Sequence, residues 1–143
     1  MVKLRATASL SRPLRSPLRA TLDAVDASPH PEGEWEPARE LLGDQLLARL
    51  LRISASSLRR YADGDRRTPD EVAWRLHLVA RLLAALVGSY NDYGIRRWFE
   101  RRRSALDGAT PAELLERADV EDDERLERVL ALAEQLTGAV TAA

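Results

Sequence analysis

The sequence predicts an all-α protein, and three features of its 143 residues lead to that prediction. Leu, Ala and Arg, which are strong helix formers, dominate the composition. No run of strand length alternates apolar with polar residues, whereas several stretches repeat apolar residues every three or four positions. Aromatic residues make up only 5% of the chain. We therefore expect an all-α fold.

The composition restricts the class of protein. The hydrophobic fraction of 45% and the charged fraction of 31% are ordinary for a globular protein with a modest core. The chain has no cysteine, which excludes disulfides, thiolate metal sites and a cysteine nucleophile. It also lacks the apolar block of a signal peptide and any apolar run near the roughly 20 residues of a membrane helix. We expect a cytoplasmic protein without a membrane partner.

Charge is unevenly distributed along the chain. The formal net charge is −1, so the protein as a whole does not attract nucleic acid. Residues 1–20 contain five basic residues and no acid, whereas residues 113–127 contain eight acids and two arginines. Any DNA-binding surface must therefore come from local clusters of basic residues.

Residues 1–36 form a basic, proline-containing tail. Pro13, Pro17, Pro29 and Pro31 interrupt this stretch too often for a long helix, although residues 18–25 are long enough for two turns. We interpret the tail as flexible, as chain ends commonly are. The alternative is a basic arm that follows DNA phosphates or a minor groove beside the main DNA contact. After the tail, a short helix is expected from Ala38 to Leu42.

The stretch from Gly43 to Arg67 has the pattern of two short helices joined by a tight turn. Asp44 is placed to cap the first helix and Ser54 to cap the second. The inward faces are apolar at helical spacing, with Leu47, Leu50 and Leu51 in the first helix and Leu58 and Tyr61 in the second. This pattern predicts a helix-turn-helix, in which Arg52 occupies the turn position where many such motifs have Gly.

The second helix of this pair and the polar turn after it leave hydroxyl and guanidinium groups outward. Such groups bond phosphates and guanine edges. The predicted DNA contacts are Ser54, Ser56, Ser57, Arg59, Arg60, Arg66 and Arg67.

A long apolar helix should follow from Pro69 to about Val87, after a capping box formed by Thr68 and Glu71. Its apolar positions are Val72, Leu76, Val79, Leu83 and Leu86, widened by Leu78, Leu82 and Val87. A helix that is apolar nearly all round is buried on more than one side, either as a spine between two parts or in a homodimer interface. His77 within it is expected to be a packed side chain rather than a metal ligand.

Residues 90–143 should form further helices. Ile95, Trp98 and Phe99 share one face of a helix that Asp92 is placed to cap and that runs to Arg103, with arginines on its other faces. The arginines are either a solvated rim paired with the late acids or a cationic patch for a partner protein or phosphate. Thr110 and Glu113 form a second capping box. The last helix should begin near Asp122 or Asp123 and end at Gly138, with the outward pairs Glu121–Arg125 and Glu124–Arg128.

The segment 90–115 resembles the C-terminal domain of Xre/MbcA/ParS-like antitoxins. The matching residues are Gly94, Arg96, Arg97, Trp98, Leu106, Gly108, Thr110, Pro111, Leu114 and Leu115. The preceding helix-turn-helix pattern fits the Xre type, so the resemblance covers about residues 38–136.

The resemblance implies a division into an Xre-like helix-turn-helix domain, residues 37–89, and a small helical toxin-binding domain with a short C-terminal tail, residues 90–143. A family member of this kind represses its own operator DNA and neutralises a NAD-consuming RES-domain toxin by direct binding. The residues expected to contact the toxin are Arg96, Arg97, Trp98, Arg101, Arg102 and Thr110.

A stand-alone transcription regulator without a toxin would carry the same residues, so this alternative stays open. An enzyme is not expected, because the chain has no Gly-rich phosphate loop, no cysteine and no two histidines near each other in sequence. No cofactor and no metal site are predicted.

Overall fold

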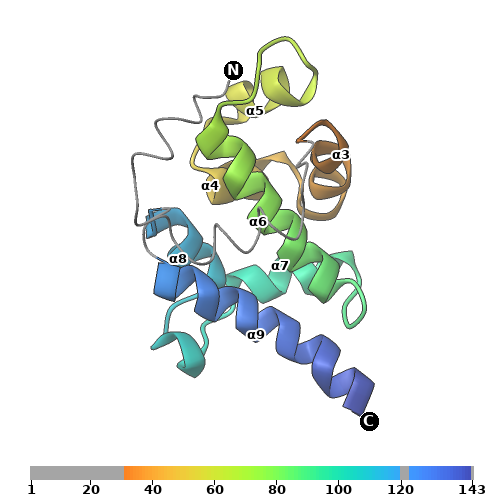
Figure 1. Cartoon of the computed structure of the whole chain (residues 1–143), viewed down its shortest axis with the longest axis vertical. Helices are drawn as coiled ribbons and strands as arrows, with labels where there is room; N and C mark the ends of the chain where they lie inside the picture. Colours follow the sequence, from red (N-terminus) through yellow and green to blue (C-terminus); the bar gives the residue numbers. More distant parts are fainter. Residues whose placement is uncertain (1–30, 120–122, 143) are drawn as a thin grey trace, which may run out of the picture.

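Seven α-helices and one 3-10 helix make up the part of the chain that this computed structural model describes, residues 31–119 and 123–142 (Figure 1). No strand occurs in these residues, which confirms the all-α prediction. The predictions for residues 1–30 and for the Glu121–Arg125 pair lie outside the described residues. The helices are α3 (Pro31–Leu42), α4 (Asp44–Leu51), α5 (Ala55–Ala62), α6 (Asp70–Leu86), α7 (Asp92–Glu100), η2 (Ser104–Leu106), α8 (Pro111–Arg117) and α9 (Asp123–Ala142).

Helix α6 is the central element. It packs against α3, α4 and α9, and it crosses the middle of the view in Figure 1. Its apolar stripe is buried, and so are Arg75 and His77. The prediction of a long helix buried on more than one side is confirmed, with each end within one residue of the expected position.

The predicted capping box at the start of α6 is wrong. Pro69 is the N-cap residue, no side chain caps the helix, and Thr68 lies outside the first turn. The carboxylate of Glu71 instead accepts a hydrogen bond from Nε of Arg75 at 3.4 Å. The buried guanidinium is a stronger donor for this carboxylate than a backbone amide at an exposed helix start.

The predicted cap at the start of α4 is also wrong. Gly43 is the N-cap residue, with φ of 81°, and Asp44 is the first helical residue. The Asp44 carboxylate accepts two hydrogen bonds from Arg39, Nε to Oδ1 at 2.9 Å and Nη2 to Oδ2 at 3.0 Å. Only Gly43 separates the end of α3 from the start of α4, so the last turn of α3 presents Arg39 to this carboxylate. A bidentate ion pair therefore replaces the helix cap.

Helix α3 begins at Pro31, seven residues before the expected start at Ala38, so residues 31–36 are helical and not part of a tail. Pro37 lies inside the helix and removes one backbone hydrogen bond. The helix forms despite this loss because Trp35, Ala38 and Leu42 are buried in the core. The centroid of the Trp35 ring lies 6.5 Å from that of Tyr61.

Helix α9 begins at Asp123, as expected, but the predicted end at Gly138 is wrong because the helix continues to Ala142. A glycine inside a helix costs only about 1 kcal/mol relative to alanine, so it does not by itself end one. Arg128 bonds the Ala105 carbonyl and the Asp107 carboxylate rather than Glu124. None of the described helices is long and apolar enough to cross a membrane.

One hydrophobic core extends across the boundary expected between residues 89 and 90. It runs from Trp35 in α3 to Ala133 in α9 without a break. Helix α3 packs on α7, and α4 packs on α8. The two predicted functional parts, residues 37–89 and 90–143, therefore share their packing, and their division stays a prediction about function.

Candidate functional site

The joint between α4 and α5 is a left-handed turn at Arg52. Its φ is 63°, a conformation that costs a residue with a side chain about 1–2 kcal/mol. The amides of Arg52 and Ile53 donate to the carbonyls of Arg49 and Ala48, both at 3.1 Å, and so close the end of α4. Ser54 then caps α5, as predicted, because its Oγ accepts the amide of Ser57 at 3.0 Å.

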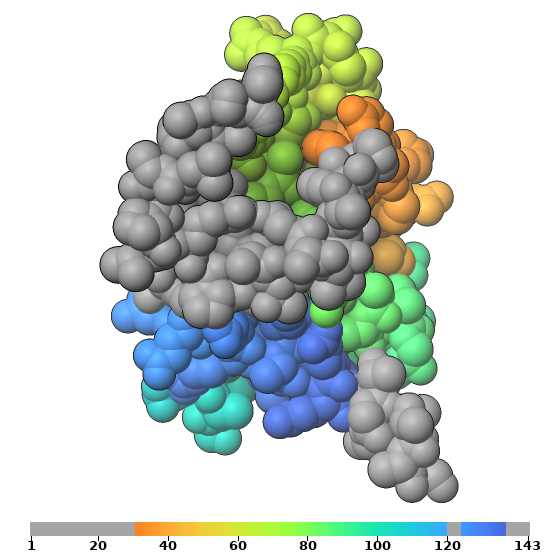
Figure 2. All heavy atoms as spheres, viewed as in Figure 1, coloured from red at the N-terminus to blue at the C-terminus, as the bar shows by residue number. Residues whose placement is uncertain are grey.

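Helix α5 presents the predicted polar set to solvent. Leu58 is fully buried against the core, whereas Ser54, Ser56, Arg59 and Arg60 are exposed and Ser57 is half-buried. Arg66 and Arg67 in the turn that follows are also exposed. Helix α5 and this turn lie together at the top of Figures 1 and 2, whereas η2 and α9 lie toward the other end.

Most guanidinium groups at this end are unpaired within the described part of the chain. The side chains of Arg59, Arg60 and Arg66 make no hydrogen bond or ion pair with another described residue. Arg67 lies 3.7 Å from Asp70, and both side chains are largely exposed. Exposed arginines without fixed partners are available for phosphate oxygens or base edges.

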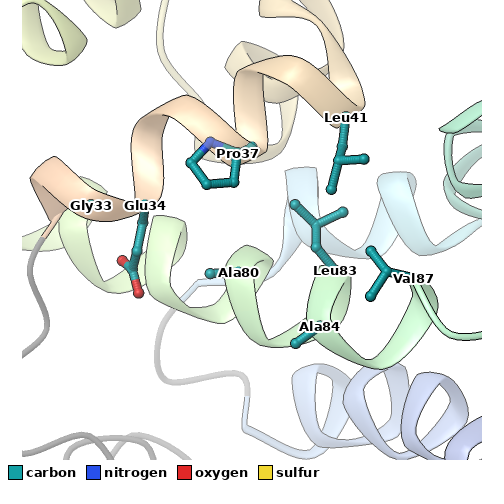
Figure 3. A pocket seen from close by; sticks show the side chains of 9 residues that line it. Gly33, Glu34, Pro37, Leu41, Ala80, Leu83, Ala84 and Val87 are labelled. Carbon is teal, nitrogen blue, oxygen red and sulfur yellow. The ribbon is translucent and has the colours of Figure 1, made fainter.

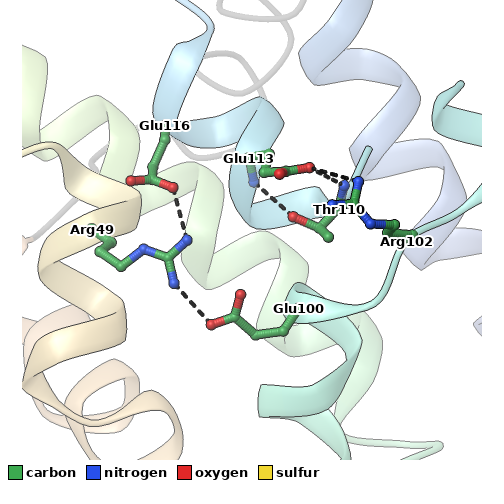
Figure 4. Close-up of polar contacts among 6 residues, drawn as sticks. All are labelled: Arg49, Glu100, Arg102, Thr110, Glu113 and Glu116. Carbon is green, nitrogen blue, oxygen red and sulfur yellow. Dashed lines mark hydrogen bonds and ion pairs between the residues drawn. The ribbon is translucent and has the colours of Figure 1, made fainter. Parts of the chain in front are cut away.

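Two of the residues predicted to contact a toxin lie in the interior. Trp98 is 2% exposed and packs edge-to-face on Phe99 with ring centroids 5.2 Å apart. Thr110 is buried and forms the second capping box as predicted, with its Oγ1 accepting the Glu113 amide at 3.0 Å and its amide donating to Oε1 of Glu113 at 2.9 Å (Figure 4). The bond from the Thr110 amide lowers the pKa of Glu113. Since both side chains are buried, we remove Trp98 and Thr110 from the set of contact residues.

The arginines predicted in the same set separate into two groups. Arg96 is half-buried and donates to the Leu41 carbonyl at 2.9 Å, which ties α7 to α3. Arg97, Arg101 and Arg102 are exposed. Arg102 donates to the Gly108 carbonyl at 3.0 Å and lies 3.8 Å from the Glu113 carboxylate, so the expected pairing with late acids holds for Arg102.

Tyr93 is a surface residue that the sequence reasoning missed. Its side chain is 60% exposed, its hydroxyl accepts a hydrogen bond from Arg97 at 3.0 Å, and the guanidinium lies 5.6 Å from its ring centroid. The spacing of four residues between Tyr93 and Arg97 was the available signal. Tyr93, Arg97 and Arg101, four residues apart along α7 and just beyond its end, give this surface an aromatic and cationic character.

The sequence did not predict the interhelical hydrogen bonds of three further arginines, Arg49, Arg52 and Arg75. Arg49 of α4 bonds Glu100 of α7 and Glu116 of α8, each at 2.8 Å (Figure 4). Arg52 donates to the Ala118 carbonyl at 3.2 Å and to Asp119 at 2.9 Å. Arg75 donates to the carbonyls of Leu115 and Ala118. The position of Arg75 among the apolar residues Val72, Leu76 and Val79 was the one signal that it needs buried acceptors.

An apolar cavity of about 320 Å³ lies between α3 and α6 (Figure 3). Its walls are formed by Pro37, Ala38, Leu41, Ala80, Leu83, Ala84 and Val87, with Gly33 and Glu34 at one end. Oε2 of Glu34 lies 2.7 Å from Nδ1 of His77, which ties α3 to α6 and confirms the packed role expected for this histidine. Within the described residues, no group of three or more His, Asp or Glu side chains is placed to hold a metal ion.

No family model, curated protein or solved structure matches this chain.

Proposed function

We propose that the protein is a cytoplasmic antitoxin that binds its own operator DNA through α5 and neutralises a NAD-consuming RES-domain toxin through the surface of α7 and α8. The observation that carries the proposal is the outward face of α5. That face combines exposed hydroxyl groups with unpaired guanidinium groups on a helix whose inward residue, Leu58, is fully buried.

This geometry supports the DNA-binding part of the proposal. A short helix held by a tight turn and exposing several arginines matches what a recognition helix in a major groove requires. The overall charge of −1 does not oppose this, because the exposed Arg59, Arg60, Arg66 and Arg67 lie together on α5 and the turn after it. A homodimer would place two such helices on the half-sites of a two-fold operator.

The toxin-binding part is supported by the resemblance of residues 90–115 and by the exposed surface of α7. Gly108, at φ of 86°, and the capping box of Thr110 set the turn between η2 and α8. The Gly108 carbonyl in this turn accepts a hydrogen bond from Arg102, and Arg97, Arg101 and Arg102 are all exposed. We propose these three arginines and Tyr93 as the contacts to the toxin.

A stand-alone regulator is the second candidate, and the burial of Trp98 and Thr110 favours it. Both residues belong to the matched motif, and both are explained by packing and capping without a partner. A protein that lost its toxin would retain them for stability alone.

The proposal predicts a reading frame beside this gene that encodes a RES-domain toxin, and co-expression with that toxin tests it. We expect the antitoxin to restore growth and to co-purify with the toxin. Arg97→Gln combined with Arg101→Gln should weaken co-purification and leave operator binding intact, whereas Arg59→Gln combined with Arg60→Gln should do the reverse. A toxin that stays fully active in excess of this protein would leave the stand-alone regulator as the function.

A further inference from the structure

Three arginines connect α4 and α6 to α7 and α8, and we call them the arginine cluster: Arg49, Arg52 and Arg75. Together they reach Glu100, Glu116, Asp119 and the carbonyls of Leu115 and Ala118. The carbonyl of Ala118, the residue that ends α8, accepts from both Arg52 and Arg75. Cationic side chains thus occupy the negative end of the α8 dipole and satisfy its last carbonyl groups.

Arg75 anchors the cluster in the core. Its side chain is 2% exposed, and it donates to the Leu115 carbonyl at 2.8 Å. Burial lowers the pKa of Arg75, and the positive charge of the nearby Arg52 lowers it further. Two guanidinium groups are held close together here because the carbonyls of α8 and the carboxylates of Glu71 and Asp119 offset their repulsion.

Arg52 connects this anchor to the turn before α5. Its backbone closes α4 in the left-handed conformation, and its side chain bonds α8. A glycine would adopt the same turn without strain, but it would have no side chain to reach α8. Strained backbone persists where surrounding contacts determine it, and the contacts to Ala118 and Asp119 are of that kind.

Helix α5 depends on this turn for its position. It is short, it packs against α4 and α3, and Leu58 is its one fully buried residue. Helix α4 in turn packs against α8, where Arg49 bonds Glu116, and Arg52 bonds Ala118 and Asp119 just beyond the end of α8. Helix α4 therefore contacts both α8 and α5.

We infer that the arginine cluster couples the end of α8 to α5, so that a partner which draws Glu116 or Asp119 away from Arg49 and Arg52 loosens α5. The inference rests on the proposed function for its biological meaning, because it joins the proposed toxin-binding part to the proposed DNA-binding helix. Thermodynamic linkage makes the coupling reciprocal, so DNA held by α5 also strengthens the contacts at α8.

Hydrogen exchange of the full-length protein, without DNA or toxin, tests the coupling directly. The test variant combines Glu116→Gln and Asp119→Asn, which remove carboxylate partners of Arg49 and Arg52. No residue of α4 or α5 is substituted in this variant. The matched control is Glu134→Gln, which removes another exposed interhelical pair, Arg81–Glu134 at 2.8 Å between α6 and α9.

We expect the test variant to exchange the backbone amides of residues 58–62 about threefold faster than the parent protein, while the control leaves them unchanged. Unchanged exchange in α5 of the test variant, or an equal rise in the control, would overturn the coupling. A double-mutant cycle of Arg52→Gln and Asp119→Asn provides a second test. Their effects on the exchange of α5 amides should be less than additive when the two substitutions are combined. Fully additive effects would also count against it.

Operator binding by the same variants separates this inference from the proposed function. Faster exchange in α5 together with weaker binding to the DNA upstream of the gene supports both. Faster exchange with unchanged DNA affinity keeps the coupling and removes α5 as the DNA-binding helix.

Discussion

Arginines have different roles at the two ends of this molecule. At α5 the guanidiniums of Arg59 and Arg60 are exposed and bond no other described residue. Between α4 and α8 the guanidiniums of Arg49 and Arg52 bond carboxylates and a carbonyl. The same residue type thus supplies an available surface on α5 and interhelical contacts between α4 and the region of α8. Availability, rather than the number of arginines, distinguishes a candidate binding surface from a structural contact.

The helix caps at these two ends differ in the same way. Ser54 caps α5 at an exposed position with a single hydrogen bond. Thr110 caps α8 at a buried position with two reciprocal hydrogen bonds. Water can satisfy the Ser57 amide if Ser54 is lost, but it has little access to the buried site around Thr110. We therefore expect residues near α8 to contribute more to the free energy of unfolding, and residues of α5 to contribute more to operator binding.

The largest expected effect comes from the core of the α7 end. Trp98→Ala should lower the free energy of unfolding by about 3–5 kcal/mol, because it removes a large buried ring and leaves a cavity. Urea denaturation measures the loss. Tyr93→Ala on the same helix is the matched control and should change stability little, since that ring is 60% exposed. Similar losses for the two variants would contradict the placement of Trp98 in the core.

Substitution at the α5 end should affect binding rather than stability. Arg59→Ala and Arg60→Ala should each weaken operator binding by about 1–3 kcal/mol if the side chains read bases, and less but uniformly across sequences if they hold phosphates. Gel-shift titrations at several salt concentrations distinguish these cases. Arg97→Ala on α7 is the control and should leave DNA affinity unchanged. An equal loss for Arg97→Ala would remove the functional difference between the two ends.

The two caps provide a smaller effect. Thr110→Val keeps the shape of the side chain and removes the hydroxyl, and it should cost about 1–2 kcal/mol of unfolding free energy. Ser54→Ala should cost less, about 0.5 kcal/mol, because its site is open to water. Parallel denaturation curves test the ranking. A larger loss at Ser54 would reverse the comparison between the ends.

The smallest expected effect is a pH dependence at the junction of α3 and α4. The hydrogen bond from Arg39 lowers the pKa of Asp44 below its ordinary value of 3.8, with smaller contributions from the charges of Arg39 and Arg59. This stabilisation is present above pH 3.8 and is lost as the pH falls through the folded pKa. For a partly exposed pair we expect about 0.5 kcal/mol.

Asp44→Asn should therefore be less stable than the parent protein at pH 6. This difference in stability should shrink as the pH falls below 3.8, the ordinary pKa of the carboxyl group. Thermal unfolding across this range measures it. Arg39→Gln should show the same behaviour, since it removes the partner. A difference that stays constant with pH would exclude the ion pair as its cause.

Much of the helical framework could be predicted because its causes are local. The stripe of α6 and the caps at Ser54 and Thr110 depend on residues within a few positions of each other, where helical periodicity and side chain to backbone hydrogen bonds act. The caps expected at Asp44, Thr68 and Asp92 were wrong although their local patterns were equally good, and at the last of these Asn91 caps α7 instead, its Oδ1 accepting the Gly94 amide at 2.8 Å. In the first case the end of the preceding helix supplied an arginine to Asp44, and in the second Pro69 took the N-cap position itself.

By itself, the sequence determined the all-helical architecture, the outward face of α5 and the capped start of α8. The tertiary structure alone decided which arginines are available and which are used internally. Arg49 and Arg52 meet partners on α8 and just beyond its end that lie 66 or 67 residues further along the chain. The physical reason is that periodicity fixes the face of a helix on which a guanidinium lies, whereas the packing of another helix against that face decides whether it meets a carboxylate or water.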